Sequence, residues 1–165
     1  MRMAKQLINI PSEINVVYGQ IMLFNNNGGK LYPIGESWQK IKEKFKQVMC
    51  IPHLGAMHRS GLFEKIGKFD ETFRIAGDYE LLLRELKKGG STFIPDFIIA
   101  GMRQGDISSA PTNALKAMSE IRLAQRMHGQ TFPRILWLLS MVKFYIRLLL
   151  WRFLDEKLAK KSRFW

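Results

Sequence analysis

Cysteine is nearly missing from this sequence, in which Cys50 is the only one. A single thiol excludes an internal disulfide and any metal site built from several cysteines, and it fits a reducing compartment. No internal repeat or low-complexity tract divides the 165 residues. This length predicts one domain with a core of its own, with room for an appendage. We expect Cys50 to serve packing.

We also expect no secretory leader. The first residues, MRMAKQLINIPSEINVVYG, start with basic side chains but contain no apolar core of signal-peptide length and no small-residue cleavage site. The sequence therefore predicts a protein that stays on the cytoplasmic side.

Acidic residues are few, since 26 Lys and Arg face 14 Asp and Glu and give a net charge of +12. Residues 116–165 hold 11 basic and 3 acidic residues, so most of the excess lies in the last third of the chain. Such an imbalance favours an anionic partner. We expect no nucleic-acid partner, because the sequence has no zinc-ligand spacing, helix-turn-helix pattern or aromatic-basic RNA-binding motif.

The hydrophobic pattern predicts interleaved strands and helices. Residues 14–24 are rich in β-branched and aromatic side chains and run into an Asn-Gly turn, which is typical of a strand. Apolar side chains at helical spacing predict helices over 36–47, 78–88, 113–127 and 133–160, and a Ser60-capped turn over 60–66. Residues 91–100 predict an edge strand interrupted by Pro95. The fold class is α/β with a helical carboxyl-terminal tail.

An ordered set of motifs runs from His53 to Ser109: His53 itself, HRSGLF at 58–63, GKFDE at 67–71, AGDYELLLR at 76–84 and ISS at 107–109. Their order and spacing resemble those of family 2 glycosyltransferases, and the INVVYG segment at 14–19 is similar to a strand of the same family. The resemblance covers about residues 7–110.

The resemblance implies a partial GT-A-like (nucleotide-diphospho-sugar transferase) fold over residues 1–110, followed by a basic amphipathic helical tail over 111–165. It also implies transfer of a sugar from a nucleotide-diphospho-sugar donor to a hydroxyl of a glycan or lipid-linked acceptor, usually with inversion, in polysaccharide or lipid-linked glycan synthesis.

Asp78 matches the position of the family's catalytic base. Inverting transfer needs a base within hydrogen-bond reach of the acceptor hydroxyl, and a carboxylate at the mouth of a helix can serve. The alternative is that Asp78 only caps the helix that starts there, a common use of aspartate. Glu80 has helical spacing to Arg84, so we interpret Glu80 as structural.

Five further residues are candidates for substrate binding. The resemblance places His53 on the acceptor side and Asp70 and Glu71 in a loop that shapes the acceptor pocket. Arg59 and Arg103 are candidates for phosphate contacts, because a guanidinium suits bidentate binding of a diphosphate. The alternatives are a core or loop residue for His53, a turn cap for Asp70 and solvated surface for Arg59.

Relatives hold a divalent cation, Mg²⁺ or Mn²⁺, with an Asp-x-Asp motif, and this sequence contains no such motif. The ligands for that cation are therefore not expected in this chain, and no residue is assigned to a metal. We expect the chain to be inactive alone, either because it is a fragment or truncated reading frame of a longer enzyme or because a separate chain supplies the amino-terminal half. The alternative function is a non-catalytic module, derived from the same fold, that binds a membrane surface or a partner.

The tail has the composition of a membrane-surface helix. Between Ile135 and Leu154 the only charges are Lys143, Arg147 and Arg152, and Trp and Tyr side chains are interspersed. Cations within the span argue against crossing a bilayer and favour a helix that lies in the interface. We expect residues 133–165 to bind the inner face of the membrane peripherally. The alternative is packing against the protein's own core or a partner.

Overall fold

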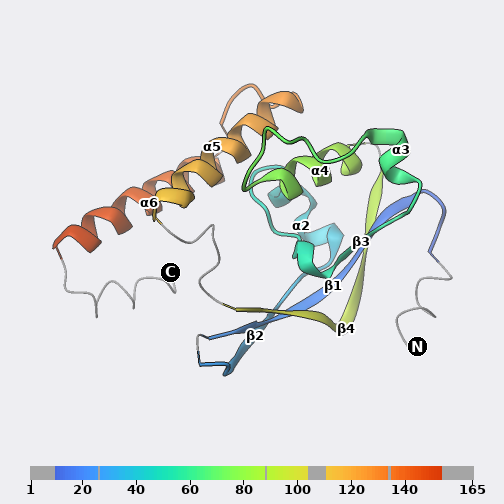
Figure 1. Cartoon of the computed structure of the whole chain (residues 1–165), viewed down its shortest axis with the longest axis horizontal. Coiled ribbons are helices and arrows are strands. Elements are labelled where there is room, and N and C mark those ends of the chain that lie inside the picture. The colour runs from blue at the N-terminus through green and yellow to red at the C-terminus, as the bar shows by residue number, and fades with distance from the viewer. Residues whose placement is uncertain (1–9, 26, 88, 104–110, 134, 154–165) are drawn as a thin grey trace.

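The computed structural model describes residues 10–25, 27–87, 89–103, 111–133 and 135–153 (Figure 1). These residues form a mixed α/β domain, as the interleaved pattern predicts. The amino-terminal residues 1–9, the Ile107–Ser109 motif and the basic end after Phe153 lie outside the described residues. In chain order the elements are β1 (Ile14–Phe24), β2 (Lys30–Ile34), α2 (Trp38–Phe45), the 3-10 turn η1 (His53–Gly55), β3 (Ala56–His58), α3 (Leu62–Ile66), α4 (Gly77–Leu86), β4 (Gly90–Arg103), α5 (Pro111–Met127) and α6 (Ile135–Phe153).

Strand β1 is the centre of the sheet. Its amino-terminal half pairs antiparallel with β3, and its carboxyl-terminal half pairs antiparallel with β2 on the same edge. The other edge pairs in parallel with β4 along the whole length of β1. The sheet is therefore mixed. Strand β1 is the apolar strand predicted over 14–24, and it is paired on both of its edges.

Strand β4 is longer than the sequence predicts. It continues past Ala100 to Arg103, three residues beyond the predicted end of the strand. Its pairing with β1 steps from Ile94 to Ile98 while β1 advances by one residue, which marks a bulge around Pro95. Asp96 takes a φ of 54° in this bulge. Proline interrupts the ladder as predicted, but the strand resumes beyond it.

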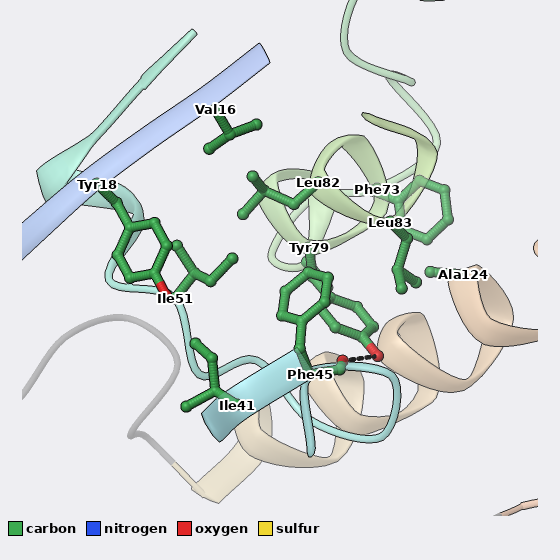
Figure 2. Close-up of a cluster of buried hydrophobic side chains, with 11 residues drawn as sticks. Val16, Tyr18, Ile41, Phe45, Ile51, Phe73, Tyr79, Leu82, Leu83 and Ala124 are labelled. Carbon is green, nitrogen blue, oxygen red and sulfur yellow. Dashed lines mark hydrogen bonds between the residues drawn. The ribbon is translucent and has the colours of Figure 1, made fainter. Parts of the chain in front are cut away.

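The hydrophobic core lies between one face of the sheet and helices α2, α4 and α5 (Figure 1). Alternate residues Val16 and Tyr18 of β1 face it, because side chains of a strand alternate between its two faces. Figure 2 shows Tyr79 and Leu82 of α4 gathered with Phe45 of α2 in the same cluster as these strand residues. The Tyr79 hydroxyl donates to the Phe45 carbonyl oxygen at 3.0 Å, so the only polar end of this side chain is satisfied inside the core.

Helices α3 and α4 test the predicted helix boundaries. Helix α4 begins one residue before Asp78, close to the predicted start, and Leu81, Leu82 and Leu83 are buried. Helix α3 ends at Gly67, whose φ of 84° is the left-handed conformation that favours glycine, also as predicted. The predicted Ser60 cap is wrong, because α3 begins after Gly61 and has no side-chain cap.

Helix α6 runs back beside α5, and its carboxyl end projects beyond the rest of the fold (Figure 1). The Trp137 indole N–H donates to the Met118 carbonyl oxygen at 3.3 Å, and Phe144 is buried. Within the described residues, no helix combines the length and hydropathy needed to span a bilayer.

Candidate functional site

A pocket of about 500 Å³ opens between the carboxyl-terminal half of β1, the segment around η1, the start of α4 and α5. This volume is in the range of small-molecule sites. Most of the lining is apolar, with residues such as Ile21, Leu23, Pro52, Ile75, Met102 and Ile121, and its acidic and basic side chains are those of His53, Asp78 and Arg103. A mostly apolar pocket with a few convergent polar groups is the usual form of a binding site.

His53 and Asp78 are in direct contact in this pocket. The His53 Nδ1 atom lies 2.9 Å from Asp78 Oδ2, and the two side chains are 49% and 28% exposed. The other carboxylate oxygen, Oδ1, accepts the backbone N–H of Tyr79 at 2.8 Å. The pair is thus open to a ligand, while the carboxylate is held at both oxygens. These two residues were predicted separately, 25 positions apart in the sequence.

Asp78 does not occupy the cap position of α4. The cap residue is Ala76, which has no side-chain cap, and Asp78 lies within the first turn. The carboxylate accepts one neighbouring amide rather than closing the helix end. The simple capping alternative therefore does not describe the contacts of Asp78.

Glu120 of α5 binds the backbone just before α4. One carboxylate oxygen, Oε2, accepts the backbone N–H groups of Arg74, Ile75 and Ala76 at 3.1, 2.7 and 2.9 Å. Burial opposes the charge on Glu120, but the three amides outweigh this effect and lower the pKa of its carboxyl below the ordinary value. Helix α5 therefore fixes the loop that leads into Asp78.

Sequence reasoning missed Glu120, although the sequence contained a signal. Glu120 shares with Ala117, Ile121 and Ala124 the spacing of one helix face, the face that is turned toward the domain. An acid on the buried face of an amphipathic helix needs a partner. The partner could not be named, because it is a row of backbone amides more than 40 residues away.

Glu80 is structural, as expected from its spacing to Arg84. Its two carboxylate oxygens lie 2.8 Å from Arg84 Nη2 and 3.0 Å from His128 Nε2. Arg84 also donates to the carbonyl oxygens of Ile66 and Lys68. This buried cluster ties α4 to the ends of α3 and α5 and leaves the pocket to Asp78.

Three of the predicted binding residues do not line this pocket. Arg59 donates to the carbonyl oxygens of Ile14 and Pro11, so it fastens the start of β1. Asp70 accepts the N–H and the hydroxyl of Thr72 in a tight turn, and these hydrogen bonds lower the pKa of its carboxyl. Glu71 is exposed beside it.

Arg103, at the end of β4, does line the pocket.

The residues of the pocket do not fit a divalent cation. Asp78 and His53 offer two ligand groups, while Mg²⁺ and Mn²⁺ prefer several oxygen ligands, and the third polar group, Arg103, is itself cationic. Across the described ranges, no three His, Cys, Asp or Glu side chains gather as a metal site. The pocket of this chain is therefore assigned no metal ligands.

Comparison with protein-family models and with curated proteins finds no match to this chain. The class of site rests on geometry alone: a carboxylate–imidazole pair and a guanidinium in an apolar pocket of an α/β domain.

Proposed function

We propose that this chain is the acceptor side of a family 2-like glycosyltransferase with a GT-A-like fold, in which Asp78 is the base. It would transfer a sugar from a nucleotide-diphospho-sugar to a hydroxyl acceptor in polysaccharide or lipid-linked glycan synthesis. The observation that carries the proposal is the convergence of His53, Asp78 and Arg103 on one pocket.

The roles follow from the chemistry of each group. The acceptor oxygen forms a bond to the anomeric carbon as the bond from that carbon to the diphosphate breaks, and the acceptor proton passes to Asp78. His53, at 2.9 Å, orients the carboxylate when its Nδ1 carries the proton. Arg103 is the cation in the pocket that suits the departing diphosphate.

The test measures release of nucleoside diphosphate from a panel of UDP- and GDP-sugars with Mg²⁺ or Mn²⁺. The chain is assayed alone and together with the polypeptide encoded immediately upstream, since the cation ligands are expected outside this chain. We expect activity in the mixture, and we expect Asp78→Asn to lower kcat at least about a hundredfold, the usual contribution of a general base.

Asp96→Asn is the matched control. It makes the same change from carboxylate to amide at an exposed site in the β4 bulge, and asparagine tolerates the positive φ found there. The control should keep full activity. Activity that survives Asp78→Asn would remove Asp78 as the base.

The alternative is a non-catalytic module that binds a membrane surface or a partner chain. The exposed apolar residues of α6 favour it, because such side chains on a surface helix indicate an interaction face. A mixture that binds nucleotide sugars without turnover, in wild type and Asp78→Asn alike, would support this alternative over catalysis.

A further inference from the structure

One side of α6 is an exposed apolar stripe. Six aliphatic side chains fall on this side at helical spacing, and each is between 46% and 69% exposed: Ile135, Leu138, Leu139, Val142, Ile146 and Leu149. Tyr145, 52% exposed, lies at one margin of the stripe, and the exposed Lys143 lies at the other. A continuous patch of this kind marks an interaction surface.

The opposite side of α6 already holds the helix on the domain. Phe144 is buried there, Trp137 donates to the Met118 carbonyl oxygen, and the Leu136 amide donates to the Gln47 side chain at 3.4 Å. The stripe is therefore not the face that folding uses. It points away from the core described above.

A groove of about 610 Å³ lies between α5 and α6, and its lining residue Met141 is one helical turn from Leu138 and Tyr145, at the margin of the stripe. Leu115, Leu123, Trp137 and Met141 give it an apolar lining, and Lys116, Arg122 and Arg126 line it from α5. Lys116 and Arg126 are exposed. The apolar surface of α6 is thus bordered by cations on both sides, Lys143 on one and the α5 residues on the other.

No exposed carboxylate balances these cations on the two helices. Glu120 is the only acid in residues 111–153, and it is buried with its carboxylate on the amides of Arg74, Ile75 and Ala76. Arg122 and Arg126 are one helical turn apart, and burial together with the charge of Arg126 lowers the pKa of Arg122. The surface as a whole attracts anions.

We propose that the α5–α6 face docks on an anionic lipid bilayer, with the α6 stripe among the acyl chains and Lys116, Arg126 and Lys143 at the lipid phosphates. An apolar stripe flanked by cations is the arrangement of a helix that lies in the membrane interface. A second copy would bring cations against cations, and a nucleic acid would leave the stripe exposed. The proposal does not depend on the glycosyltransferase activity.

The experiment is co-sedimentation of the full chain with vesicles of phosphatidylcholine containing about 30% phosphatidylserine, and with pure phosphatidylcholine. We expect at least about tenfold stronger partition onto the anionic vesicles, and a loss of binding near 0.5 M NaCl, where headgroup charges are screened. Equal binding to both vesicles, or none to either, would overturn the proposal.

Two pairs of variants locate the surface. The double variant Leu139→Gln, Ile146→Gln should reduce partition at least about tenfold. Its matched control, Leu31→Gln with Ile98→Gln, changes exposed apolar residues of β2 and β4 and should bind as wild type.

The double variant Arg126→Gln, Lys143→Gln should weaken binding to the anionic vesicles. Its matched control, Lys40→Gln with Lys68→Gln, changes exposed lysines on α2 and after α3 and should not weaken binding.

Circular dichroism should be used to check that each variant is folded. If the Leu139→Gln, Ile146→Gln variant is unfolded, the Arg126→Gln, Lys143→Gln variant still tests the same face. If both test pairs bind like their controls, the face is wrong. A dimer in the absence of vesicles that the stripe variant converts to monomer would assign the stripe to a second copy and overturn bilayer docking.

Discussion

The Asp78 carboxylate accepts from two sides, the Tyr79 amide and the His53 ring. The amide contact joins two neighbouring residues of the helix and needs no tertiary contact. The imidazole contact requires η1 to lie against the mouth of α4, and this depends on the tertiary fold. The first contact alone would describe a local structural role, while the second places the carboxylate in a pocket with a titratable neighbour.

Cys50 is among the residues that line this pocket, and its thiol is predicted to be unreactive. Burial raises the pKa of its thiol to about 11, opposed by Lys44 and assisted by Glu36, and the sulfur lies 3.9 Å from the Ile41 carbonyl oxygen. The thiolate is the reactive form, so the native chain at pH 8 should react with iodoacetamide roughly a hundredfold more slowly than the chain unfolded in urea.

Mass spectrometry of the alkylated chain over time gives both rates. The native rate should climb as the pH rises from 8 to 10, because the thiolate fraction grows with it. Equal rates in the native and unfolded chain would show that Cys50 is not shielded.

At single positions, residue type and motif order selected three residues that line the pocket, but they did not predict the hydrogen-bond partners of the others. Asp78, His53 and Arg103 could be selected by type and motif order, but not Arg59, whose guanidinium serves carbonyl oxygens near the start of β1. Backbone acceptors of this kind have no residue-type signature. The turn-cap interpretation of Asp70, by contrast, needed only the two residues that follow it, and the Thr72 hydrogen bonds agree with it.

Helix α5 reaches the start of α4 through Glu120, and this link should contribute to stability. Glu120→Gln keeps the shape of the side chain and removes the charge that three amides share. We expect a loss of about 1–3 kcal/mol in the free energy of unfolding at pH 7, measured by urea denaturation. Glu64→Gln, at an exposed site on α3, is the control and should change little.

The same link sets a pH dependence. Because the folded state lowers the pKa of Glu120, its carboxylate stabilises the fold above the ordinary value of 4.5, and this contribution is lost as the pH falls below that value. The difference between wild type and Glu120→Gln should therefore shrink toward pH 3.5. A difference that stays constant would mean that the charge does not matter.

Element types were predictable where hydrophobic periodicity is local. The apolar run of β1, the helical spacing of α2 and the Gly67 stop of α3 all lie within a few residues of the feature they determine. Pairing was not predictable in this way. The parallel alignment of β4 with β1 joins residues more than 70 positions apart. Strand β4 continues to Arg103 because β1, its pairing partner, extends as far as Phe24.

Across the whole molecule, the net charge of +12 predicts self-repulsion. Raising NaCl from about 20 to about 200 mM should increase Tm by a few degrees, because the Debye length falls to about the spacing of neighbouring surface charges. Scanning fluorimetry without vesicles measures this. A Tm that falls with salt would mean that ion pairs outweigh repulsion; the Glu80–Arg84 pair is too buried to be screened strongly.

Helix α5 separates the two proposed surfaces of the molecule. Ala117 and Ile121 line the Asp78 pocket from one side of the helix, while Ser119 and Leu123 line the groove beside α6 from the other. A helix with its side chains is about 10 Å thick. On a docked protein this thickness would fix the distance between Asp78 and the lipid phosphates. The protein would then select acceptors whose hydroxyl lies at that distance from the bilayer.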